Sequence, residues 1–283
     1  SFHPQIRSAA SNRFGGDKNF VAYAESLRGA SPSRHMAISE ALNNFSLTLA
    51  PAVVERQFHG RVLYAGGDDL MAMLPVSELL PAMASLRAVY SGISSSSVGG
   101  QKDDGGYAQQ ANGFVRHGRQ VLRVMGEAAT ASIGAVIAHH QTPLNLVLRE
   151  LKSAEQRAKD GGRNAFAISV LKRSGGALHL VCQWARDEDD PPMACLRALS
   201  AALAGDEASR RAAYNVQAWS ADLPEPSQFA DANSYRTMLR QLLAYQLDRQ
   251  GLENAATHAS RLAQMAPVDS RANALGFINN FLS

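Results

Sequence analysis

The chain has 283 residues, 46% hydrophobic and 19% charged, with a formal net charge of +3, so an intrinsically disordered chain is excluded and one large or two modest domains are expected. Cys182 and Cys195 lack the spacing of a zinc finger or a disulfide framework, which fits a reducing cytoplasm. No apolar run approaches the ~18 residues of a membrane helix and no signal peptide is recognisable, so a cytoplasmic protein without membrane contact is expected.

The first fifth of the chain predicts helices after a polar start. Residues 1–20 are too polar for a core strand. A helix is expected from Ser33, a plausible N-cap, because apolar residues recur at helical spacing as far as Leu49. Pro51 should break or kink this helix, and a second helical piece is expected over residues 52–58.

Two short apolar runs follow, residues 62–65 and 70–74, and predict a β-hairpin. They are joined by Gly66, Gly67, Asp68 and Asp69. Glycine tolerates the positive φ that tight hairpin turns require. Two adjacent carboxylates after two residues without side chains could let a phosphate and a divalent cation approach the backbone. An ordinary solvated turn explains the same residues, because Gly and Asp dominate turns on conformational grounds alone.

The central part of the chain alternates helical and strand patterns. Gly134 lies in an expected central strand, at a position where another backbone could pass close by. The basic residues of 112–126 fit a solvated surface. The expected elements are a helix over 76–90, a mobile loop over about 91–110, a strand over 128–138, a helix over 143–159 capped by Gly161 and Gly162, and strands over 164–171 and 177–184.

The order of these elements predicts an α+β fold, in which an antiparallel sheet carries helices on one face, as in a ferredoxin-like or palm domain. Residues 186–192 form an acidic, proline-closed linker, and a domain boundary is expected there. The predicted domains are residues 1–185 and an all-helical domain over 186–283. Helices are expected over 196–203, 208–219, 234–248 and 255–265.

Three motifs in this order resemble landmarks of the GGDEF nucleotidyl cyclase superfamily. They are Gly66-Gly67-Asp68-Asp69 in a hairpin, Thr130-Ala-Ser-Ile-Gly134 in a strand, and Ala158-Lys159-Asp-Gly-Gly-Arg163-Asn164 after a helix. Three flanking stretches narrow the resemblance: 31–42, 137–140 and 172–175. Together they resemble the second palm domain of the large polymerase-like subunit of type III, Cmr-type, CRISPR effector complexes, and the helical tail resembles that subunit's C-terminal domain.

The resemblance implies synthesis of cyclic oligoadenylates from ATP with two Mg²⁺ or Mn²⁺ ions, switched on when the assembled complex captures target RNA. The partners that it implies are the other subunits of the complex, crRNA and target RNA through the complex, and a second palm domain. That other palm, a zinc-binding module and a His-Asp nuclease domain have no counterpart in the sequence. The chain is therefore expected to be a C-terminal portion of the subunit or a split subunit.

The reaction decides which residues are candidates. Joining a 3′-hydroxyl to an α-phosphate requires charge neutralisation and a lowered hydroxyl pKa, which two metal ions can supply. Asp68 is the leading catalytic and metal-binding residue, because hard cations prefer carboxylate oxygens. Asp69 is its neighbour or a second catalytic ligand, and Asp17 is a further metal ligand. Gly66 and Gly67 leave room for the nucleotide, and Lys159 and Arg163 are expected to contact the triphosphate. Ser33 is a candidate nucleotide contact, although N-capping explains it equally well.

One position departs from the family pattern and keeps an alternative open. Where the family's first strand ends in Asp-Gly-Asp, this chain has Gly15-Gly16-Asp17, so the outer acidic residue is missing. The alternative is a catalytically degenerate palm that positions RNA or neighbouring subunits without turnover. Transfer of AMP to another small molecule also stays open, whereas a diguanylate cyclase that uses GTP conflicts with GGDD and with the flanking stretches.

Overall fold

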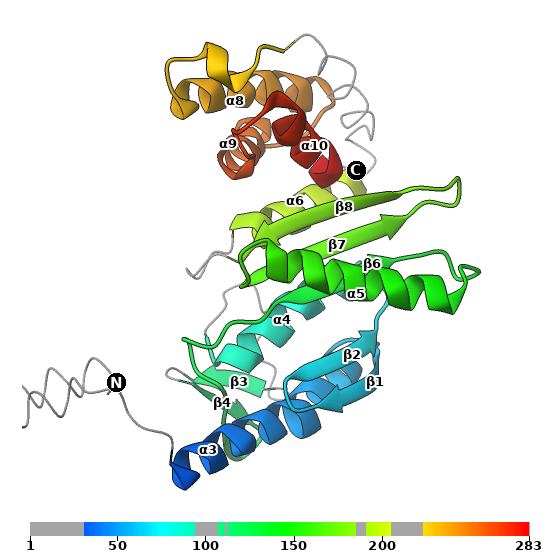
Figure 1. Ribbon diagram of the computed structural model, residues 1–283, viewed down its shortest axis with the longest axis vertical. Coiled ribbons are helices and arrows are strands. Elements are labelled where there is room, and N and C mark those ends of the chain that lie inside the picture. Colours follow the sequence, from blue (N-terminus) through cyan, green and yellow to red (C-terminus); the bar gives the residue numbers. More distant parts are fainter. Residues whose placement is uncertain (1–30, 94–106, 111–112, 185–190, 205–222, 283) are drawn as a thin grey trace, which may run out of the picture.

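The computed structural model describes residues 31–93, 107–110, 113–184, 191–204 and 223–282. Helices and a hairpin form one end of the molecule, a three-stranded sheet lies in the middle, and the C-terminal helices form the other end (Figure 1). The chain is a mixed helix-and-sheet palm followed by helices, which confirms the predicted fold class.

The N-terminal helical segment is longer and more continuous than its sequence predicts. Its parts are α3 (Pro32–Asn43), η1 (Asn44–Leu49) and η2 (Ala52–Gln57). Pro51 does not break it, since its φ of −62° and ψ of −37° are helical. The turns on both sides are π-type, and these wider turns accommodate the ring and the missing N–H of proline. The helix begins two residues earlier than expected, because the N-cap is Ser31, not Ser33.

The predicted hairpin is present and consists of β1 (Arg61–Gly66) and β2 (Asp69–Met73). Contrary to expectation it does not join one antiparallel sheet, since β6 (Ile133–Ile137), β7 (Ala165–Leu171) and β8 (Ala177–Gln183) form a separate sheet. In that sheet β6 and β7 are parallel, because the helix between them returns the chain to the same edge before the next strand begins.

A second small sheet occupies the region predicted to be loop and solvated surface. It consists of β3 (Tyr107–Gln110), β4 (Phe114–His117) and β5 (Gln120–Arg123), paired in that order. The prediction of a mobile loop is therefore wrong for residues 107–110, while residues 94–106 lie outside the described residues. The strand signal was missed because polar and basic side chains interrupt it.

Helix α4 (Leu79–Ser91), entered through the short turn η3 (Val76–Glu78), connects the hairpin with the three-stranded sheet. Met83 packs in the core cluster of β6, β7 and β8. Six residues further along the helix, Val89 packs in the cluster that holds the hairpin. The predicted apolar stripe of this helix thus serves two cores and fixes their relative position.

Helix α5 (Leu144–Asp160) covers one face of the three-stranded sheet. Ala165 and Ala167 of β7 form a small cluster with alanines of α5, whereas the alternate residues Phe166 and Ile168 face α4 and the C-terminal helices. Helices therefore cover both faces of the sheet, not one. Gly134 confirms its predicted role, because a Cβ there would lie 2.4 Å from the backbone nitrogen of Glu155 in α5.

The C-terminal part is helical, as predicted. It contains α6 (Pro191–Ala204), the short turn η5 (Pro226–Gln228), α8 (Ala232–Arg249), α9 (Ala255–Met265) and α10 (Arg271–Leu282), of which α10 was not predicted. The linker 186–190 and the expected helix over 208–219 lie outside the described residues, and the predicted boundary at residue 185 stays a prediction. Trp184, Met193 and Leu243 belong to one buried cluster that runs from the sheet into these helices. None of the helices in the described ranges is long and apolar enough to cross a membrane.

We expect Gly134→Ala to lower the free energy of unfolding by about 1–3 kcal/mol, because the added methyl group must push α5 away from β6. The measurement is chemical denaturation followed by circular dichroism. Gly276→Ala in α10 is the matched control, since a Cβ there has open space and alanine favours the helix by about 0.5–1 kcal/mol. Equal stability of the Gly134→Ala variant and the wild type would contradict this account of the close approach.

Candidate active site

The turn of the β1–β2 hairpin presents both carboxylates to solvent. Gly66 and Asp69 are the last paired residues, so the loop is Gly67 and Asp68 alone. Gly67 has a φ of +62°, a conformation that favours glycine and suits the first position of a two-residue hairpin loop. Asp68 and Asp69 are exposed, and neither carboxylate has a hydrogen bond or ion pair with another residue of the described ranges. Both are free to bind a cation.

The base of the hairpin is held by two glutamates from flanking helical segments. Glu55 accepts a hydrogen bond from the backbone N–H of Val62 at 3.1 Å. Glu78 accepts one from the backbone N–H of His59 at 2.8 Å, and its other oxygen lies 2.7 Å from Nδ1 of the same histidine. These bonds lower the pKa of Glu78. The hairpin is therefore fixed at its base and open at its turn.

The two expected phosphate contacts lie where α5 ends. Gly162 has a φ of +101°, and Arg163 and Asn164 also have positive φ, which turns the chain sharply into β7. The side chain of Gln183 in β8 donates to the carbonyl of Gly161 at 3.0 Å and holds this turn against the sheet. Positive φ at residues other than glycine is costly and is concentrated at functional sites.

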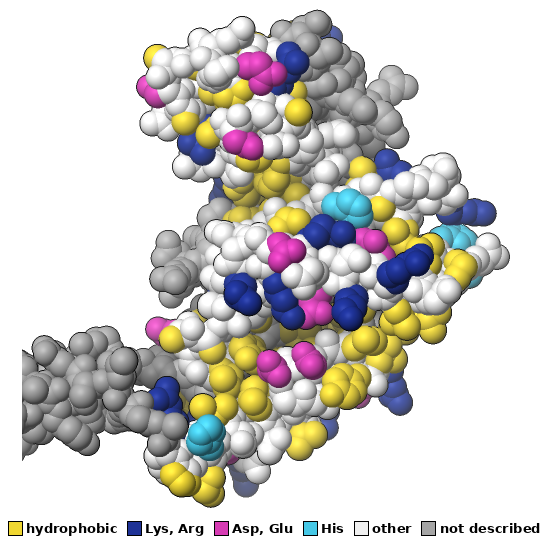
Figure 2. All heavy atoms as spheres, viewed as in Figure 1, with side chains coloured by type: hydrophobic (Ala, Val, Ile, Leu, Met, Phe, Trp, Pro, Cys, Tyr) yellow, Lys and Arg dark blue, Asp and Glu magenta, His cyan; other side chains and the backbone are white. Residues whose placement is uncertain are grey.

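Charge interactions connect this turn with the hairpin. The pKa of Lys159 is raised, first by its hydrogen bond and charge interaction with Glu155 and to a smaller extent by the charge of Asp69, while burial and the charge of Arg163 oppose the rise. Figure 2 shows Lys and Arg side chains in a row along α5, opposite two acidic side chains across a hollow. Lys159 therefore lies within electrostatic range of both Asp69 and Arg163. Burial, and then the charge of Asp68, raise the pKa of Tyr90 in α4.

Glu155 is a residue of this site that the sequence analysis missed. Its carboxylate lies 2.6 Å from Nζ of Lys159, and both side chains are a little over 40% exposed. The spacing of four residues on one helix was the available signal, because such pairs meet on the helix surface. A phosphate that binds Lys159 must therefore compete with Glu155.

The donors present at the hairpin turn fit a hard divalent cation, since Asp68 and Asp69 are exposed carboxylates without partners in the described part of the chain. The third expected ligand, Asp17, lies outside the described residues together with Gly15. Within the described ranges, no three His, Cys, Asp or Glu side chains gather as a metal-binding group. The turn thus offers two carboxylates, and a cation bound there would need further oxygen ligands.

Ser33 is not brought to this site. Its hydroxyl lies 3.1 Å from that of Ser31, at the exposed start of α3. The start of α3 is well separated from the hairpin in Figure 1. Its expected contact with nucleotide stays an untested prediction that this placement does not favour.

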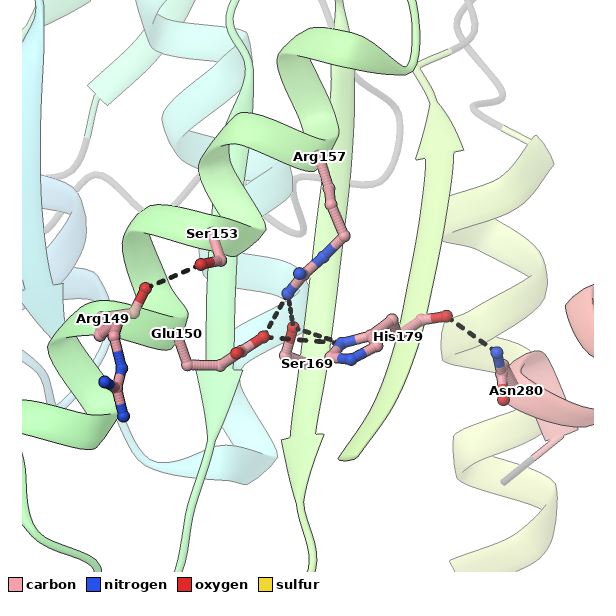
Figure 3. Close-up of polar contacts among 7 residues, drawn as sticks. All are labelled: Arg149, Glu150, Ser153, Arg157, Ser169, His179 and Asn280. Atoms are coloured by element: carbon pink, nitrogen blue, oxygen red, sulfur yellow. Dashed lines mark hydrogen bonds and ion pairs between the residues drawn. The ribbon is translucent and has the colours of Figure 1, made fainter. Parts of the chain in front are cut away.

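A polar cluster on the other flank of α5 anchors the helix to the sheet (Figure 3). Arg157 donates to Glu150 and, at 2.7 Å, to the hydroxyl of Ser169, which lies 3.2 Å from Nδ1 of His179. Burial opposes ionisation of Glu150, but hydrogen bonds from Ser169 and Arg157 outweigh it, so its pKa is lowered. Asn280 of α10 donates to the carbonyl of His179 at 2.9 Å.

This cluster contains a serine, a histidine and a glutamate, but it is not arranged as a hydrolase triad. Glu150 and Ser169 both approach the same ring nitrogen of His179, so the carboxylate cannot orient the ring from its opposite side. Ser169 is also fully buried. The cluster holds α5 in place and joins it to the C-terminal helices.

Comparison with known proteins identifies relatives of the palm region. Residues 13–167 match the family described as Cas10/Cmr2, second palm domain. A CRISPR system CMR subunit Cmr2 from Saccharolobus solfataricus is 32% identical over 129 residues, which are 46% of this chain and 11% of that protein. A CRISPR system Cmr subunit Cmr2 from Pyrococcus furiosus is 29% identical over 184 residues, which are 64% of this chain and 17% of that protein.

A solved structure has the same fold. A chain of the cryo-EM structure of type III-B Cmr-beta in the apo state matches 88% of this chain and 27% of its own length, with a TM-score of 0.57 and 18% identity. The chain therefore corresponds to a minor part of the proteins that it matches.

We expect Glu155→Gln to lower the pKa of Lys159 toward its ordinary value, because the carboxylate that stabilises the ammonium is removed. Arg163→Gln should raise it, since a repelling charge is lost. The measurement is an NMR titration of the lysine side chains. Glu253→Gln, an exposed change in the helical part, is the control. An unchanged titration of Lys159 in Glu155→Gln would contradict the assignment.

Any stability from the Lys159–Glu155 pair is present below the ordinary lysine pKa and is lost as pH rises through the raised pKa of Lys159.

Proposed function

Because the chain belongs to the Cas10/Cmr2 family, with the second palm domain over residues 13–167, we propose that it is the nucleotidyl-transferring part of a type III CRISPR complex. In this proposal it makes cyclic oligoadenylates from ATP when the assembled complex captures target RNA. One observation carries the proposal: the hairpin turn exposes two carboxylates that have no partner among the described residues, and one of them, Asp69, interacts electrostatically with Lys159 at the end of α5. A purely structural turn has no need of this arrangement.

In this proposal the acidic residues of the site bind cations and the basic residues bind phosphate. Asp68 and Asp69 would hold Mg²⁺ or Mn²⁺ ions, which when bound neutralise the triphosphate and lower the pKa of the attacking 3′-hydroxyl. Lys159 and Arg163 bind phosphate oxygens and hold the triphosphate in line for loss of pyrophosphate. Gly67 leaves the turn open, since nothing lies within 4 Å of a Cβ placed there. Glu155 keeps Lys159 oriented before the nucleotide enters.

The partners follow from the reaction. Cyclisation needs a donor and an acceptor nucleotide, and we propose that a second palm domain holds the other ATP across an interface. The other subunits, crRNA and target RNA would act through the assembled complex. Both named relatives are subunits of CRISPR Cmr systems, which supports an assembly of this kind.

A second candidate function is a degenerate palm that positions RNA or neighbouring subunits. Gly15 favours it, because a residue without a side chain stands where an acidic ligand is expected. The exposed Asp68 and Asp69 oppose it, since nothing in the described fold requires two adjacent free carboxylates at this turn.

The proposal predicts that Asp68→Asn, Asp69→Asn reduces oligoadenylate synthesis at least ~100-fold, because the charges that hold the cations are removed while the side-chain volumes stay. The measurement uses the complex assembled with the full chain, target RNA, labelled ATP and Mg²⁺ or Mn²⁺. The fold should be unaffected, since neither carboxylate has a partner among the described residues.

The controls separate the two candidate functions. Asp248→Asn, an exposed change in α8, should leave synthesis unchanged. Binding of target RNA should persist in the double variant. A wild-type complex that yields no product under these conditions would contradict the enzymatic proposal and favour the RNA-positioning function.

A further inference from the structure

The first strand of the hairpin contains an irregularity beside the candidate site. The pairing runs from Val62 with Ala72 directly to Tyr64 with Met71, so Leu63 is an extra residue in β1. This is a β-bulge, and bulges occur next to active sites, where they redirect a side chain. The question is which side chain this bulge redirects.

Without the bulge, Tyr64 would face the protein core. In a regular strand, residues two apart point to the same face, and Val62 packs in the cluster that contains Leu70 and Ala72 of β2. Tyr64 would therefore share the face of Val62. The extra residue reverses this alternation and places Tyr64 on the outer face with its partner Met71.

The same reversal places Gly66 and Asp69 on that outer face, since they are paired two residues closer to the turn. A Cβ at Gly66 would lie 2.7 Å from the hydroxyl oxygen of Tyr64 and 3.1 Å from its Cζ. The ring therefore lies along the strand over Gly66, the residue that pairs with Asp69. The ring of Tyr64 occupies the space that a side chain at position 66 would fill, so the missing side chain of Gly66 allows this position of the ring.

The ring is accessible in this position. Tyr64 is 56% exposed and has no hydrogen bond to another described residue, so neither the core nor a polar partner explains where it lies. Figure 2 shows hydrophobic side chains adjoining the two acidic ones on the same side of the molecule as the cationic row of α5. An exposed aromatic ring beside a phosphate-binding group is the arrangement on which nucleic-acid bases stack.

We propose that Tyr64 is a positioning residue of the nucleotide site, whose ring stacks on the base of the nucleotide held by Asp68, Asp69 and Lys159. This rests on the proposed function and adds the base-binding part of the site. The ring gives affinity without choosing among bases, because every base has a π-face. The bulge at Leu63 and the missing side chain at Gly66 are the two features that place it there.

The test measures binding, not turnover. The full chain is titrated with 2-aminopurine riboside triphosphate in the presence of Mn²⁺, and the fluorescence of the base reports stacking. Tyr64→Phe should keep both affinity and quenching, because the ring remains. Tyr64→Ala should weaken binding about tenfold and abolish the quenching. Inorganic triphosphate, which has no base, should bind Tyr64→Ala and the wild type equally.

The controls keep this proposal distinct from the proposed function. Tyr245→Ala removes a tyrosine of equal exposure (57%) from α8 and should change nothing. If Tyr64→Ala binds the nucleotide as well as Tyr245→Ala does, the proposal for Tyr64 is overturned while the site stands. Equal losses for the nucleotide and for inorganic triphosphate also overturn it, because the tyrosine would then only shape the turn. A wild type that binds neither compound overturns both proposals.

Discussion

The close approach of α5 to β6 is the constraint on which the candidate site depends. Gly134 lacks the side chain that would hold the helix away, and the backbone of Glu155 lies directly above it. Small residues extend the same contact, since Ala154 and Ala158 of the helix meet Ala165 and Ala167 of β7. Because α5 packs this close to the three-stranded sheet, Lys159 near its end lies within electrostatic range of Asp69, which belongs to a different sheet.

The second requirement is that the hairpin and the three-stranded sheet keep their relative position without sharing hydrogen bonds among the described residues. Helix α4 provides this through side chains, because its apolar stripe enters both cores. The acids and the cations thus belong to two separately built parts. Polar anchors hold each part, Glu55 and Glu78 at the base of the hairpin and the Glu150–Arg157–Ser169 cluster beneath α5.

Sequence reasoning predicted most elements because their patterns are local. The hairpin, the helix that becomes α5 and the strands on either side of Lys172–Gly175 are present close to the expected bounds. The β3–β5 sheet was missed because its strands are short and polar, and α10 because its apolar residues follow no strong period. Pro51 was judged by its usual effect in an α-helix, which wider helical turns remove.

By itself the sequence determined which residues are candidates for the site, since Gly67, Asp68, Asp69, Lys159 and Arg163 were recognisable from residue type, spacing and order. It also determined that a backbone would cross Gly134. Only the tertiary structure decided which groups meet: that Glu155 holds Lys159, that Ser33 lies apart, and that a bulge turns Tyr64 outward. The physical reason is the distance along the chain over which each interaction acts. Turn and helix preferences act over a few residues. Which face of a strand is buried, and how two sheets pack, depend on register and packing over the whole fold.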